Sequence, residues 1–291
     1  MEKNLYIQKM IKKKIFVSTT FIANGNSVNQ AINLLVKNNI NNIELGSNHV
    51  YQKNLIIPKG PKYIVHNYFP VPKKDLIINI ASLNAKIRKE SIKHILNSIN
   101  FTKKIKGKLY TFHPGFISDP KKVSSSKKNY DFVYERKKLE LNVYEKSWQN
   151  MVKALKIIGK YALKKKVKIC IETEGSYNLP EKLIMQRPEE FIRLKSFLQK
   201  YKIGINLNIG HLNLSSNFFG FNKFEFINMI EKQIYAMELS HNYGKNDDHL
   251  PLKKGQWYWQ IINNKKFKNT IKILEFRNSN IKKIKNNIKY F

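Results

Sequence analysis

Short runs of β-branched and apolar residues alternate along the chain with longer stretches whose apolar positions recur every three or four residues. This alternation is typical of βα units on a parallel sheet. The clearest helical stripe carries Trp148, Met151, Leu155 and Ile158, and another helix is predicted after Pro188. Strands are predicted over 15–21, 42–45, 63–65, 109–112, 167–171, 203–207, 234–239 and 270–276. Eight strands, each followed by a helix or a long loop, predict a single (β/α)8 TIM barrel of the α/β class over residues 1–291.

An open, doubly wound sheet is the main alternative to a barrel. It has little support, because no Gly-rich phosphate loop follows the first predicted strand. A polar segment, DPKKVSSSKKNY, predicts a long loop over about 116–134, ahead of a helix that runs to about residue 163. Helices are also expected over 224–231, over 257–267 and from residue 280.

The composition suits one large core, since 42% of the residues are hydrophobic and 12% are aromatic. The single cysteine, Cys170, excludes an internal disulfide and fits a reducing compartment. The first residues contain no apolar stretch of signal-peptide length, and no later run approaches the length of a membrane span. We therefore expect a cytoplasmic protein that does not insert into a membrane.

The charge is strongly basic, with 54 Lys and Arg against 20 Asp and Glu, a formal net charge of +34. Such an excess suggests a polyanionic partner such as nucleic acid. Nearly all of it is Lys, however, whereas phosphate recognition favours the bidentate fork of Arg. Abundant Asn and Ile beside the Lys indicate compositional drift. Nucleic acid thus stays open as a partner but is less favoured than a small substrate.

Polar side chains gather where the predicted strands end, and in a (β/α)8 barrel those ends build the active site. Asp247 and His249 lie just beyond the seventh strand. A single His at a strand end would more often be structural. Here five of the seven histidines (His66, His113, His211, His241 and His249) lie at or just beyond strand ends, together with several carboxylates. The residues at the strand ends themselves are Glu44, His66, His113, Glu172, Asn208, His211, Glu238, His241 and Glu275.

Carboxylates crowded into one barrel mouth repel each other unless they are paired or bound to a cation. The sequences ICIE (169–172) and ILE (273–275) place Glu172 and Glu275 directly after buried apolar residues. Glu–Lys pairing is the alternative to a metal, but few of the strand ends carry Lys. A mixture of imidazole and carboxylate suits Zn²⁺ or Mn²⁺, and carboxylates alone suit Mg²⁺.

These motifs occur in the order found in one family: HNYF (66–69), INIAS (78–82), FHPG (112–115), IETEG (171–175), NIGH (208–211), ELSHN (238–242), DDHLP (247–251) and ILE (273–275). The chain resembles the xylose-isomerase-like barrel superfamily, which includes sugar and sugar-phosphate isomerases and epimerases and the endonuclease IV family. The resemblance runs from about residue 15 to residue 277.

The resemblance implies a metal site, with Glu172 and Glu275 as metal-binding and acid/base carboxylates. Asn208 stands where the family usually has a metal-binding Asp, and Glu238 stands where many members have a His. Because these exchanges make the central position richer in oxygen, they favour Mn²⁺ or Mg²⁺ over Zn²⁺. The other ligands that the resemblance implies are His66, His113, His211, Asp247 and His249.

The preferred hypothesis from sequence is a metal-dependent sugar or sugar-phosphate isomerase or epimerase, in which Glu172 and Glu275 pass a proton on and off carbon. His241, Trp257 and Arg277 are the expected substrate-binding residues, although a WYW cluster is more often core. Two alternatives stay open: an endonuclease IV-like phosphodiesterase acting on abasic DNA, and a non-catalytic sugar-binding barrel.

Overall fold

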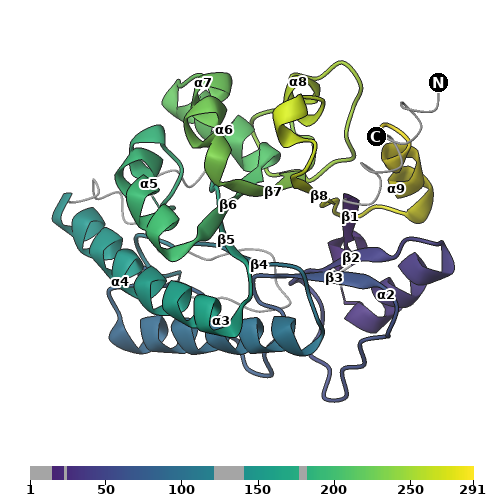
Figure 1. Cartoon of the computed structure of the whole chain (residues 1–291), viewed down its shortest axis with the longest axis horizontal. Helices are drawn as coiled ribbons and strands as arrows, with labels where there is room; N and C mark the ends of the chain where they lie inside the picture. Colours follow the sequence, from purple (N-terminus) through teal and green to yellow (C-terminus); the bar gives the residue numbers. More distant parts are fainter. Residues whose placement is uncertain (1–14, 23–24, 121–140, 177–181) are drawn as a thin grey trace.

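A computed structural model describes residues 15–22, 25–120, 141–176 and 182–291. Eight parallel strands form a closed barrel in chain order (Figure 1). Pairing of β1 with β8, with Phe16 opposite Ile273, closes it. The predicted (β/α)8 class is therefore confirmed. The strands are β1 (Ile15–Ser18), β2 (Asn42–Leu45), β3 (Lys62–His66), β4 (Tyr110–Phe112), β5 (Ile169–Glu172), β6 (Ile203–Asn208), β7 (Ile234–Leu239) and β8 (Ile271–Leu274).

Helices surround the strands (Figure 1). The predicted stripe on α4 is buried. One face of α2 is buried as well, with Val28, Ala31, Ile32 and Leu35, and this helix begins with a capping box from Ser27. The last helix returns to the first, because Lys285 Nζ donates to Asn38 Oδ1 at 2.9 Å. The α-helices are α2 (Val28–Lys37), α3 (Ala85–Lys104), α4 (Leu141–Lys165), α5 (Pro188–Tyr201), α6 (Ile209–Phe219), α7 (Lys223–Ile230), α8 (Tyr258–Ile262) and α9 (Ile281–Ile288).

The predicted boundaries differ most at the end of β1 and in the helix predicted over 257–267. β1 ends at Ser18 rather than at residue 21, and Thr19–Ile22 form a 3-10 turn, η1. The Ser18 hydroxyl accepts from the Thr20 hydroxyl at 3.0 Å, a local bond that competes with the strand ladder. The helix predicted over 257–267 is broken, because Asn264 caps a separate 3-10 turn, η3 (Lys265–Phe267). The loop predicted over about 116–134 lies largely outside the described residues.

The barrel interior is filled in two layers, since successive side chains on a strand point to opposite faces. The lower layer is apolar and forms its own buried cluster: Phe16, Ile64, Leu109, Cys170, Ala236 and Ile273. Two positions further along these strands stand the buried polar residues Ser18, His66, Thr111, Glu172, Glu238 and Glu275. The packed lower layer thus closes the barrel beneath a polar mouth.

No helix in the described part of the chain is long and apolar enough to cross a membrane.

Candidate metal centre

The first cluster at the mouth comprises His66, His113 and Glu172, whose potential ligand atoms lie within 4.8 Å of one another. His66 Nδ1 and His113 Nε2 lie 3.8 and 3.9 Å from the same oxygen, Glu172 Oε2. His113 Nδ1 is held by Glu174 Oε1 at 2.5 Å, so its other nitrogen faces the cluster. A carboxylate behind a histidine is the usual support of a metal-binding imidazole.

The second cluster comprises His211, Asp247 and His249. The Nε2 atom of His249 lies 2.7 Å from Asp247 Oδ2, and that of His211 lies 3.7 Å from Asp247 Oδ1. Both rings are oriented from behind: His211 Nδ1 contacts the Thr173 carbonyl at 2.9 Å, and His249 Nδ1 contacts Glu275 Oε2 at 2.9 Å. The ring orientations again present Nε2 to a shared carboxylate.

A third group, Glu44, His66 and Glu238, shares His66 with the first cluster. His66 Nδ1 lies 3.5 Å from Glu238 Oε1 and 2.8 Å from Thr111 Oγ1. Glu44 is fully buried, and within the described residues neither of its carboxylate oxygens has a hydrogen bond of standard geometry. This group is the most enclosed of the three.

Asn208 does not present an oxygen to the central carboxylates. Its Nδ2 donates to Glu172 Oε1 at 2.9 Å and to Glu238 Oε2 at 3.0 Å. Its Oδ1 accepts from His211 N at 3.1 Å, as the cap of α6. The ligand role that the resemblance implies for Asn208 therefore does not match the orientation of its side chain. Asn206 supplies a second amide donor to the same pair.

Burial disfavours the charged form of every ionisable side chain in the mouth. In the first and second clusters, neighbouring groups of opposite charge outweigh this effect of burial. For His113 and His249, the neighbouring carboxylates outweigh burial and raise the pKa to about 9. The pKa of His211 is raised as well, chiefly by Asp247. The pKa values of the carboxyls of Glu172 and Asp247 are correspondingly held well below their usual range by the imidazoles around them, against burial.

The remaining acids divide by position. His249 and Arg277 outweigh burial at Glu275 and lower its pKa to about 2. Burial, followed by the charges of neighbouring carboxylates, raises the pKa of Glu44 and of Glu238. Burial also lowers the pKa of His66 to about 4. The charged forms of the imidazoles of His113, His211 and His249 are thus favoured beside the ionised acids, whereas burial favours the uncharged forms of Glu44, Glu238 and His66.

The residues present fit a divalent cation. In the described part of the chain, the ion pairs of the mouth carboxylates involve His and Arg277 rather than Lys, which removes the Glu–Lys alternative for these residues. Asp247 Oδ1 is buried with no hydrogen-bond partner among the described residues. Imidazole nitrogens combined with carboxylate oxygens are ligands suited to Zn²⁺ or Mn²⁺.

The three residues expected to bind substrate lie in different surroundings. Arg277 adjoins the second cluster, with its NH1 3.3 Å from Asp247 Oδ2. His241 packs edge-on against Tyr243, with the ring centroids 4.9 Å apart, and none of the three clusters includes it. Trp257 packs against Phe224 of α7, with the ring centroids 6.1 Å apart, in line with a core role for the WYW sequence.

Sequence reasoning did not assign roles to Glu174, Thr111 and Asn206. Each lies two positions from a predicted site residue, so the strand period could have pointed to them. Gly175 has a separate role in the IETEG motif: a Cβ there would lie 1.9 Å from the His211 carbonyl oxygen. Only glycine lets the segment after β5 pass this close to the start of α6.

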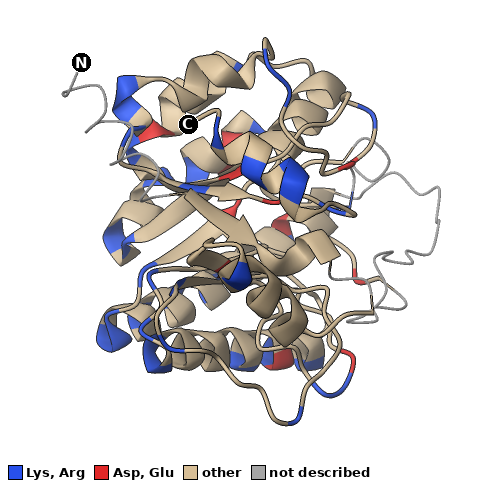
Figure 2. Cartoon of the chain, turned by 90° about the vertical axis from the view of Figure 1, so that its right-hand side faces the viewer, with Lys and Arg blue, Asp and Glu red and all other residues tan. Residues whose placement is uncertain are grey.

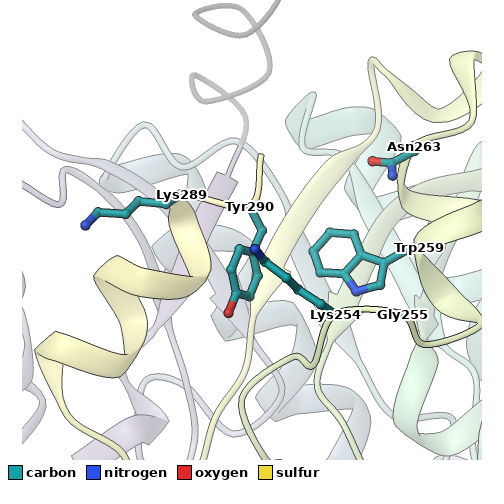
Figure 3. A pocket seen from close by; sticks show the side chains of 6 residues that line it. All are labelled: Lys254, Gly255, Trp259, Asn263, Lys289 and Tyr290. Carbon is teal, nitrogen blue, oxygen red and sulfur yellow. The ribbon is translucent and has the colours of Figure 1, made fainter.

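A cavity of about 360 Å³ lies elsewhere, beside α8 and the end of α9 (Figure 3). Lys254, Trp259, Lys289 and Tyr290 are among its lining residues, and the Lys254 ammonium lies 5.2 Å from the centre of the Tyr290 ring. Its lining contains no His or carboxylate, so this cavity is not a competing metal site.

The fold is a closed (β/α)8 barrel, and the buried His–carboxylate clusters at its strand ends are consistent with a divalent-metal site. The chain belongs to the xylose isomerase-like TIM barrel family, whose profile matches residues 50–291. It is 26% identical over 286 residues to the uncharacterized protein MJ1614 of Methanocaldococcus jannaschii, covering 92% of this chain and 94% of that protein.

Two solved structures illustrate the breadth of this fold. A D-tagatose 3-epimerase-like protein superposes with a TM-score of 0.70 at 18% identity, covering 95% of each chain. Endonuclease IV from Thermus thermophilus superposes with a TM-score of 0.58 at 12% identity, covering 96% of this chain and 97% of that one. At these identities the likeness establishes the fold alone, and the activity must be argued from the site.

Proposed function

We propose that this protein is a divalent-metal-dependent phosphodiesterase. The observation that carries the proposal is the pair of His₂–carboxylate clusters, His66–His113–Glu172 and His211–Asp247–His249, at one barrel mouth. One such set suffices for a single ion, whereas two fit a site with several ions, the arrangement used to cleave phosphodiesters. This interpretation departs from the isomerase preferred on sequence, because two His₂–carboxylate clusters exceed what a single ion needs.

Divalent cations at these clusters would stabilise charge on a phosphate as Lewis acids. The chain's own residues would set the geometry. Glu174 and the Thr173 carbonyl hold two imidazoles in place from behind. Arg277 stands beside Asp247 with 27% of its side chain exposed, and its buried Nε has no partner among the described residues. A guanidinium at this position is suited to bind a phosphate oxygen.

A sugar isomerase or epimerase is the second candidate. It is favoured by the likeness to a D-tagatose 3-epimerase-like protein and by the presence of two buried carboxylates, Glu172 and Glu275, at the same barrel mouth. Two ionised carboxylates at one mouth can take a proton from carbon and return it. This candidate needs only one ion.

Counting bound metal and testing two substrates separates the candidates. Protein purified without chelator should carry two ions per chain and cleave bis(4-nitrophenyl) phosphate, or an abasic DNA duplex, in a reaction that stops with chelator. One ion per chain, together with exchange of solvent deuterium into a ketohexose, would favour the isomerase. Protein that binds no metal under any condition would contradict both and favour a sugar-binding scaffold.

The matched variants are Asp247→Asn and Asp248→Asn. Asp247 bridges both imidazoles of the second cluster, so Asp247→Asn should lose one ion and nearly all hydrolysis. The neighbouring Asp248 belongs to none of the clusters, so Asp248→Asn should keep the ion count and the activity. Equal activity of the two variants would exclude the second cluster from the reaction.

A further inference from the structure

Two amide groups occupy the space between Glu172 and Glu238. Asn208 Nδ2 donates to Glu172 Oε1 at 2.9 Å and to Glu238 Oε2 at 3.0 Å. Asn206 Nδ2 donates to Glu238 Oε1 at 2.8 Å and to Glu172 Oε2 at 3.4 Å. All four residues are buried, so these bonds form in a medium that screens charge weakly. We call this arrangement the amide clamp.

The backbone fixes the orientation of Asn208. Its Oδ1 accepts from His211 N at 3.1 Å and caps the first turn of α6. Reversing the amide would break this cap and turn an oxygen towards two carboxylates. The nitrogen of Asn208 is therefore held towards the acids.

The clamp engages the two carboxylates unequally. Three of its four bonds measure 2.8 to 3.0 Å, but the bond to Glu172 Oε2 measures 3.4 Å. That weakly held oxygen is the one that lies 3.8 and 3.9 Å from His66 and His113. Glu172 can therefore serve the first cluster through Oε2 while Asn208 keeps its Oε1.

We propose that the amide clamp excludes a cation from between Glu172 and Glu238, so that the chain holds two ions, at the two flanking clusters, and none at the centre. An N–H group presents the positive end of its dipole, and its two hydrogens occupy the carboxylate lone pairs that a central ion would need. This inference rests on the proposed function for the flanking ions, and it assigns Asn208 the role of setting how many ions bind.

The test replaces the clamp's donor with a ligand. Asn208→Asp keeps the side-chain shape and the helix cap, since Asp caps as well as Asn, and adds a carboxylate oxygen at the centre. Asn222→Asp is the matched control: Asn222 caps α7 in the same way, by accepting from Phe224 N and Glu225 N at an exposed position. Each protein is dialysed against Mn²⁺ or Zn²⁺, and bound metal is counted by mass spectrometry.

We expect two ions per chain for the unsubstituted protein, three for Asn208→Asp and two for Asn222→Asp. An unsubstituted protein with three ions, or an Asn208→Asp variant that gains none, would overturn the inference. If the unsubstituted protein binds no ion while Asn208→Asp binds one, the proposed function fails and the clamp stands. If neither protein binds metal, both fail.

A second measurement covers the case in which the substitution impairs folding. In chelator, Asn208→Asp should melt below the unsubstituted protein, because it adds an acid beside Glu172 and Glu238. Adding Mn²⁺ should then raise its melting temperature by more than it raises that of the unsubstituted protein. Asn208→Ala removes the donor without adding a ligand, so its chelated form should also melt lower but still bind two ions. A third ion in Asn208→Ala would show that the space, rather than the ligand, sets the number.

Discussion

Three imidazoles at the mouth are each fixed through Nδ1 by an oxygen behind the ring. Glu174, the Thr173 carbonyl and Glu275 supply these oxygens to His113, His211 and His249 respectively. The rings therefore need no rearrangement to bind a cation through Nε2, and their supports should influence affinity without touching the ion.

Glu174→Gln tests this support. The amide keeps the size of the side chain but loses the charge that aligns His113, so metal affinity should fall by about 10- to 100-fold. Titration with Zn²⁺ or Mn²⁺ by calorimetry measures the change. Glu90→Gln, at an exposed position of α3, is the control and should bind as the unsubstituted protein does. Unchanged affinity in Glu174→Gln would mean that His113 is not a ligand or is oriented by other contacts.

Metal binding should also release protons. The pKa of His113 and that of His249 are about 9, so both rings are imidazolium ions at pH 7 in the metal-free protein, and the raised pKa of His211 favours its charged form as well. A ligating imidazole must be neutral, so affinity should increase as the pH rises from 6 towards 9. Calorimetry in two buffers of different ionisation enthalpy counts the protons, and we expect between two and three per chain. Binding without proton release would contradict these ring assignments.

The sequence predicted the ionisable residues of the mouth because strand ends follow directly from the hydrophobic pattern. It could not predict the clamp, because which end of the Asn208 amide faces the acids depends on the backbone N–H of His211. The strand period pointed to the position of Glu174 but not to its contact, since that side chain lies beyond the end of β5 and meets His113, which follows the neighbouring strand β4.

At the scale of the elements, the mouth depends on the contact between the segment after β5 and the first turn of α6. Thr173 Oγ1 accepts from Asn208 N at 2.9 Å, and Gly175 passes against the carbonyl of His211. Most strands and helices were predictable because the strands are buried on both faces and the helices have one apolar face. No helix was predicted over 209–219, where α6 is buried at consecutive positions rather than along one stripe. The ends of β1 and α8 could not be predicted in this way, because they depend on the Ser18 hydroxyl and on the cap that the Asn264 amide provides.

Gly175→Ala should loosen this contact. Its Cβ would meet backbone at 1.9 Å, so α6 must shift and His211 with it. We expect a loss of about 1–3 kcal/mol in the free energy of unfolding, and weaker metal binding. Gly220→Ala is the control, because Gly220 has a φ of +74° and nothing within 4 Å of the added Cβ. It should lose about 1 kcal/mol in urea unfolding yet bind metal normally. Equal metal affinity in both variants would contradict the prediction that the contact at Gly175 positions the metal-binding residues.

At the scale of the whole molecule, charge is segregated. Lys and Arg are spread over the outer helices and loops, whereas several acids lie near the strands at the centre (Figure 2). The long helix α3 alone carries Lys86, Lys89, Lys93, Lys103 and Lys104. Lys121, Lys122, Lys127 and Lys128, in the predicted loop, lie outside the described residues. The described lysines therefore match compositional drift over the surface better than a basic rim around the mouth.

This distribution predicts how the protein meets DNA. With metal removed by chelator, it should bind intact and abasic duplexes equally and weakly, because scattered lysines read only the phosphate backbone. Each phosphate neutralised releases counterions, so affinity should fall by about 10³-fold or more between 50 and 200 mM salt if six or more phosphates are contacted. Asp247→Asn should not alter this binding, since Asp247 lies in the mouth.

Any preference for the abasic duplex should appear only with metal and vanish in Asp247→Asn. Fluorescence anisotropy over a salt series measures both quantities. A preference for the abasic duplex that persists in chelator and at 200 mM salt would contradict this prediction. It would mean that the surface lysines recognise DNA and that nucleic acid is a partner of the protein.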